Sequence, residues 1–84
     1  MNADDDVTRA GNADREQASV WVDMLDREID DVSAALETTR RKARAEHRAG
    51  AVDRARTFDA EAEKQTARLR ELHRMRRTLT DRFG

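Results

Sequence analysis

Two stretches of the sequence decide the fold: ASVWVDMLDREIDDVSAAL, residues 18–36, and FDAEAEKQTARLRELHRMRRTLTDRF, residues 58–83. In both, apolar residues recur at alternating steps of three and four, which places their side chains on one face of an α-helix. The first stripe contains Ala18, Val22, Leu25, Ile29, Val32 and Leu36, and the second contains Phe58, Ala62, Leu69, Leu72, Leu79 and Phe83. Gly50 lies between them and offers the left-handed conformation in which many helices end. The pattern predicts two long helices joined by a tight turn.

The composition supports an all-α protein. A chain of 84 residues makes at most one domain, and 37% hydrophobic residues with one tryptophan and two phenylalanines leave little to fill a closed globular core. Charged residues reach 42% and proline is absent, which favours long solvated helices over a sheet. We therefore expect an elongated or oligomeric helical protein.

Local signals set the expected boundaries. The first 13 residues are small, acidic and aperiodic, and Gly11-Asn12 reads as a break. Asp14 to Gln17 have the form of a capping box, in which Gln17 reaches back to the start of the helix. A helix that continues through Gly50 is an alternative, because Ala51 and Val52 are poor caps. The expected organisation is a disordered acidic arm over 1–13 and a helical hairpin over 14–84, with helices 14–49 and 52–82.

The heptad positions predict which residues face each other. The apolar residues occupy positions a and d, here called the seam, and a tight turn at Gly50-Ala51 requires facing residue numbers to sum to about 101. The facing pairs are Val22 with Leu79, Ile29 with Leu72, Val32 with Leu69, Ala43 with Phe58, and Ala18 with Phe83. Two further pairs interrupt the apolar seam: Leu36 faces Gln65, and Leu25 faces Arg76. These are either long side chains whose polar ends reach solvent or places where another chain enters.

The residues that flank the seam support the same register. Positions e and g pair Arg40 with Asp59, Asp26 with His73, Lys42 with Glu61, and Trp21 with Arg82. Each pair is attractive and none brings like charges together. Exposed pairs contribute only ~0.2 to 1 kcal/mol each, so they select the register rather than stabilise the fold.

Apolar residues at the open end of the hairpin exceed what one seam uses. Val20, Trp21 and Met24 lie off the stripe in the first helix, and Met75 lies off it in the second. Such a surplus indicates that another surface covers them, and small helical scaffolds usually need oligomerisation. We predict a homodimer that forms a four-helix bundle. Its interface would contain Val20, Trp21, Met24, Met75 and Phe83. Another helical protein could take the place of the second copy, and in a monomer Trp21 would merely shield the end of the hairpin.

The turn is surrounded by basic residues, which suggest a second surface. Arg41, Arg44, Arg48, Arg54 and Arg56 are the expected contacts for nucleic acid or an acidic partner, with Arg40 and Lys42 beside them. No aromatic residue interleaves the arginines to stack on bases, and the pI is near 6.1 rather than above 9. A solvated charged face is the simpler interpretation.

No motif indicates catalysis, a metal or a cofactor. His47 and His73 fall far apart in the predicted hairpin and have no metal-ligand spacing. The carboxylates of residues 23–31 crowd one helix segment without a histidine, and the three glycines are too scattered to form a phosphate loop. We expect a non-enzymatic interaction module, such as a small adaptor, regulator or assembly subunit, that needs no cofactor.

The sequence also predicts a cytoplasmic location. No apolar run approaches the ~20 residues of a membrane span, and residues 1–6 lack the basic and apolar regions of a signal peptide. Cysteine is absent, so the redox compartment cannot be inferred from the sequence. We expect a soluble protein without a membrane partner.

Overall fold

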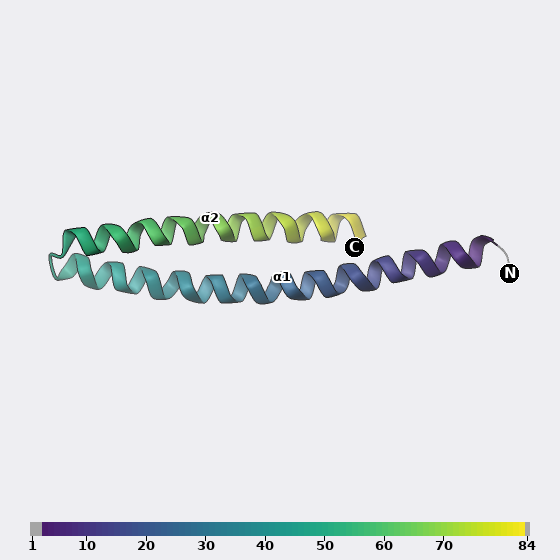
Figure 1. Ribbon diagram of the computed structural model, residues 1–84, viewed down its shortest axis with the longest axis horizontal. Helices are drawn as coiled ribbons and strands as arrows, with labels where there is room; N and C mark the ends of the chain where they lie inside the picture. The colour runs from purple at the N-terminus through teal and green to yellow at the C-terminus, as the bar shows by residue number, and fades with distance from the viewer. Residues whose placement is uncertain (1–2, 84) are drawn as a thin grey trace.

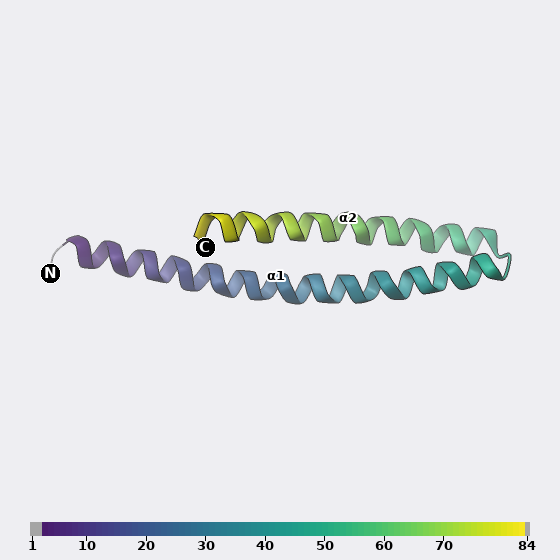
Figure 2. The same cartoon turned by 180° about the vertical axis from the view of Figure 1, so that it is seen from behind.

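The computed structural model of the chain is an antiparallel hairpin of two helices (Figure 1). It describes the backbone of residues 3–83 and the side chains of residues 13–83. Helix α1 spans Ala3–Arg48 and helix α2 spans Val52–Phe83, with no strand in this part of the chain. The molecule is a rod of 73 by 14 by 13 Å, and the view from behind shows the two helices side by side along all of α2 (Figure 2). The predicted all-α class and two-helix hairpin are confirmed.

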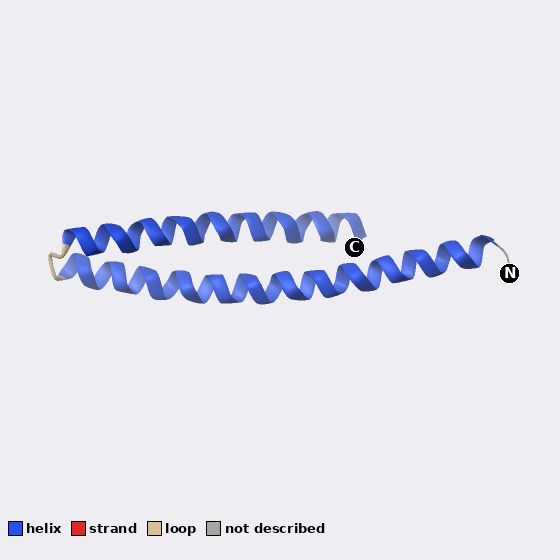
Figure 3. Cartoon of the chain, in the orientation of Figure 1, coloured by secondary structure: helices blue, strands red, loops and turns tan. Residues whose placement is uncertain are grey.

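Gly50 ends α1 as predicted. Its φ angle is 74°, in the left-handed region that costs glycine no Cβ clash. The amide of Ala51 donates to the carbonyl of Glu46 at 2.9 Å, and the amide of Gly50 donates to that of His47 at 3.1 Å. This hydrogen-bond pattern is the Schellman motif, which satisfies the last carbonyls of the helix. The connection is therefore one short loop (Figure 3), and a helix that continues through Gly50 is ruled out.

The start of α1 differs from the predicted start. The helix begins at Ala3 rather than Asp14 and passes through Gly11-Asn12 without a break. One glycine costs a helix only about 1 kcal/mol, and no proline interrupts the backbone hydrogen bonds. As a result α1 continues well beyond the C-terminal end of α2, and we call residues 3–13 the N-terminal overhang (Figure 1). Residues 1 and 2 lie outside the described residues.

The core is a single line of small and medium side chains along the seam. The most deeply buried are Ala55 at 0% exposure, Leu72 at 1%, Ala43 at 5%, Leu36 at 6%, Thr39 at 7% and Ala18 at 8%. The buried hydroxyl of Thr39 donates to the carbonyl of Ala35 in its own helix at 2.9 Å. Most other seam residues are half-buried, since a rod one helix thick on each side of the seam cannot enclose them. The buried residues thus lie at the predicted seam positions of both helices.

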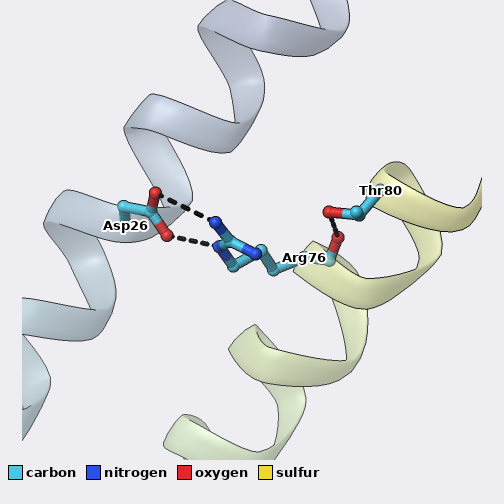
Figure 4. A network of polar contacts seen from close by, with 3 residues as sticks. All are labelled: Asp26, Arg76 and Thr80. Atoms are coloured by element: carbon cyan, nitrogen blue, oxygen red, sulfur yellow. Dashed lines mark hydrogen bonds and ion pairs between the residues drawn. The ribbon is translucent and has the colours of Figure 1, made fainter. Parts of the chain in front are cut away.

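Arg76, one of the two interruptions of the seam, turns its charged end outward. Its Nε donates to Oδ1 of Asp26 at 2.5 Å, and Nη2 donates to Oδ2 at 3.5 Å (Figure 4). This hydrogen bond, together with the charge of Asp26, raises the pKa of Arg76 above its usual value. The hydroxyl of Thr80 donates to the carbonyl of Arg76, four residues earlier in α2, at 2.9 Å. Asp26 therefore pairs with Arg76 and not with His73 as predicted, because the guanidinium offers two N–H donors at once.

The flanking partners near the turn also differ from the predicted ones. Asp59 Oδ2 lies 2.8 Å from Nε2 of His47, where the sequence pairs Asp59 with Arg40. Lys42 places its ammonium 5.9 Å from the centroid of the Phe58 ring instead of beside an acid. Exposed contacts one turn apart differ little in free energy. The register therefore predicts which charged residues lie near each other, but not which of them form a pair.

Candidate interaction surfaces

Four exposed apolar side chains gather at the open end of the hairpin. They are Val20, Trp21, Met24 and Met75, with 57%, 53%, 63% and 45% of their surface exposed, and we call them the open-end patch. The seam uses only positions a and d, whereas these residues lie at positions c, f and g. Two packed helices therefore leave them in water.

A groove between the helices runs through this patch. It has a volume of about 660 Å³ and is lined by Trp21, Met24, Leu25, Glu71, Arg74, Met75, Thr78 and Leu79. Pockets of a few hundred Å³ with a largely apolar lining are typical binding sites. Sequence reasoning missed the contribution of Leu25 and Leu79, because both were assigned wholly to the seam. In the structure they are half-buried, and each has an edge in the groove.

Phe83 lines a second, smaller groove beside the first. This groove of about 300 Å³ is lined by Asp14, Gln17, Ala18, Trp21, Leu79, Arg82 and Phe83. Trp21 and Leu79 belong to both grooves, so the two form one surface around the indole. Arg82 places its guanidinium 5.3 Å from the centroid of the Phe83 ring. The sequence paired Arg82 with Trp21, whose side chain remains more than half exposed.

The basic residues at the closed end lie on two helices. Arg41, Arg44 and Arg48 follow one face of α1, and Arg54 and Arg56 lie on the first turns of α2; all five are exposed, and we call them the basic tip. Arg54 Nε donates to Oε2 of Glu46 at 2.9 Å, so one of the five is already paired. The structure thus brings the predicted residues to one end of the rod.

The two histidines lie apart, as the hairpin predicts. His47 contacts Asp59 near the turn, and His73 lines a shallow groove with Arg76, Arg77, Thr80 and Asp81. Among the side chains that the structure describes, no three His, Asp or Glu residues come together as a metal-ligand set. Neither α1 nor α2, over the residues described, has a segment long and apolar enough to cross a membrane.

No family model, curated protein or solved structure matches this chain. The open-end patch and the basic tip are the two surfaces of this chain that could bind a partner.

Proposed function

We propose that the protein is a non-enzymatic interaction module that associates with a second copy of itself through the open-end patch. The observation that carries this proposal is the exposure of Trp21 and Met24, each more than half in water beside an apolar groove. Burying apolar surface is worth roughly 25 cal/mol per Å², so leaving these side chains exposed forgoes a large stabilisation. A rod only 14 by 13 Å thick has no further surface of its own with which to cover them.

A second hairpin supplies the missing surface. Trp21, Met24 and Met75 lie on the same side of the hairpin, around one groove, so the patch of one copy can face the identical patch of another across a twofold axis. Four helices then surround the indoles in a four-helix bundle. Such a dimer would act in the cytoplasm as a rigid rod, in the manner of an adaptor, regulator or assembly subunit.

Sedimentation of the wild type and of Trp21→Ala tests this proposal. We expect a dimer whose dissociation constant rises by at least tenfold in Trp21→Ala, because truncating a buried tryptophan at an interface commonly costs 2 kcal/mol or more. Val52→Ala is the matched control, since Val52 is 54% exposed but lies at the closed end. A wild type that stays monomeric would refute self-association, as would a dimer that Trp21→Ala leaves unchanged.

We propose nucleic-acid association through the basic tip as the alternative function. It is supported by the exposed arginines at 41, 44 and 48, which share one face of α1 and have no ion pair among the described side chains. A salt titration with a short DNA duplex and an RNA hairpin tests it, because phosphate contacts weaken steeply as salt rises. The triple variant Arg41→Gln, Arg44→Gln, Arg48→Gln should abolish binding. Lys64→Gln, Arg70→Gln, Arg77→Gln removes the same charge at exposed residues outside the open-end groove. Binding insensitive to salt, or equal in both triple variants, would exclude the tip.

A further inference from the structure

The N-terminal overhang of α1 is the part of the fold that the hairpin itself does not use. Residues 3–13 continue the line of α1 past the end of α2, by about 16 Å at 1.5 Å per residue (Figure 1). The sequence of this segment carries Asp4, Asp5 and Asp6 in a row. The basic tip lies at the opposite end of a rod 73 Å long, so the two charged ends cannot meet within one copy.

Resting on the proposed self-association, we infer that two copies overlap head to head at their open ends, with each acidic overhang lying along the other copy toward its basic tip. The overlap is centred on Met24, the most exposed residue of the open-end patch. The groove is thus occupied by a second copy of this chain, whose α1 runs in the opposite direction.

The length of the overhang fits this arrangement. When Met24 of both copies lies at the twofold axis, residues level with each other in the two α1 helices have numbers that sum to about 48. The three aspartates then come level with residues 42–44 of the second copy, where Lys42, three heptads from Trp21, lies on the same side of α1 as the open-end patch. The acidic overhang of one copy and Lys42, at the edge of the basic tip of the other, then lie at the same level along the two rods.

Charge and area both favour this overlap over other ways to pair two rods. A parallel pair would place two basic tips together and two acidic overhangs together, which is repulsive. The open-end patch exposes only on the order of 400 Å² per copy, whereas a stable dimer buries about 800 Å² per partner. The overhangs contribute the additional contact, because each lies beside the second copy over about three turns of helix.

Cysteine cross-linking tests the arrangement separately from self-association, since the chain has no cysteine of its own. Under mild oxidation, Met24→Cys should form a covalent dimer, and a mixture of Ala13→Cys with Ala35→Cys should form a mixed one. Ala49→Cys, an exposed residue beside the turn, is the control. In the overlap its two copies lie about 75 Å apart and should not cross-link. The Ala13 and Ala35 pair keeps the test valid if Met24→Cys itself weakens the dimer.

A charge variant tests the contact of the overhang. The triple variant Asp4→Asn, Asp5→Asn, Asp6→Asn should raise the dissociation constant about tenfold at low salt, because a symmetric dimer loses the attraction of six carboxylates. The difference should vanish near 1 M salt, where the Debye length is about 3 Å. Asp30→Asn, Glu37→Gln, Glu63→Gln changes the net charge equally at exposed residues that line neither groove of the open end, and it should leave the constant unchanged.

The outcomes separate the two proposals. A monomeric wild type overturns both of them. A dimer that cross-links through Ala49→Cys, or through neither Met24→Cys nor the mixed pair, overturns the head-to-head overlap and leaves self-association standing. If the expected cross-links form but the triple Asn variant leaves the dissociation constant unchanged, the role of the overhang is overturned.

Discussion

Replacing Gln65 by leucine should stabilise this protein, although the change removes a polar group from a highly charged helix. Gln65 occupies a seam position opposite Leu36, which is 6% exposed, and its Oε1 is buried with no hydrogen-bond partner among the described residues. A buried acceptor left unpaired costs about 1–3 kcal/mol. Leucine at the same position has no polar atom to satisfy and packs against Leu36. We expect the free energy of unfolding to rise by about 2 kcal/mol, and Tm by roughly 10 °C.

Urea unfolding followed by circular dichroism measures this gain, at two protein concentrations because a dimer's stability depends on concentration. Lys64→Leu is the matched control: it adds the same side chain at the neighbouring exposed position, where surface changes usually stay within about 0.5 kcal/mol. Equal effects of the two variants, or a loss in Gln65→Leu, would refute the reasoning. If Gln65→Leu changed the oligomeric state while the monomer's stability stayed the same, Gln65 would be a place where another chain enters the seam.

Three other substitutions follow from the geometry of the turn and the seam. Gly50→Ala should destabilise the hairpin by about 1–2 kcal/mol through its φ of 74°, even though a Cβ would meet nothing within 4 Å, and denaturant unfolding measures the loss. Leu72→Ala should cost about 2–5 kcal/mol, since Leu72 is 1% exposed, and the loss of helical circular dichroism reports it; a cost no larger than that of an exposed alanine substitution would contradict the burial. Arg76→Met should lower Tm by the same amount at pH 7 and pH 10. The raised pKa of Arg76 keeps its contribution fully present below the ordinary arginine pKa and lost only above it.

The hairpin could be predicted from the sequence because two independent signals agree. The apolar stripe fixes the buried face of each helix, and Gly50 is the one glycine between the stripes, so the turn position determines every facing pair. Ala55 and Leu72, both at predicted seam positions, are the two most deeply buried residues. Their burial confirms the buried face that the apolar stripe predicts for the second helix.

The start of α1 and the partners of individual charges could not be predicted in the same way. Extending a helix by one residue changes the free energy by only a few tenths of a kcal/mol. The helix can therefore continue past the capping signal at Asp14 toward the N-terminus, and it begins at Ala3. The sequence places two basic residues, His73 and Arg76, near Asp26. Arg76 is the partner because its guanidinium donates from both Nε and Nη2, a detail that a heptad assignment does not resolve.

The open-end patch was predictable as a surplus, since Val20, Trp21, Met24 and Met75 have no place in a single seam. The groove at the open end could not be predicted, because it is lined in part by the seam residues Leu25 and Leu79. How far such residues are buried depends on the distance between the two helices.

The charge distribution gives the strongest reason to look for a second copy in the opposite sense. Residues 1–31 carry ten acidic and three basic residues, and residues 32–84 carry eight acidic and fourteen basic ones. The hairpin brings part of this charge together, as at Asp26 and Arg76. The extremes remain at opposite ends of a 73 Å rod, far beyond the ~8 Å over which charges act at physiological salt. Folding alone therefore keeps Asp4, Asp5 and Asp6 away from the basic tip, in which only Arg54 has an ion pair among the described side chains. If the dissociation constant proved independent of salt, charge pairing between copies would be excluded, and burial of Trp21 and Met24 would have to hold the dimer unaided.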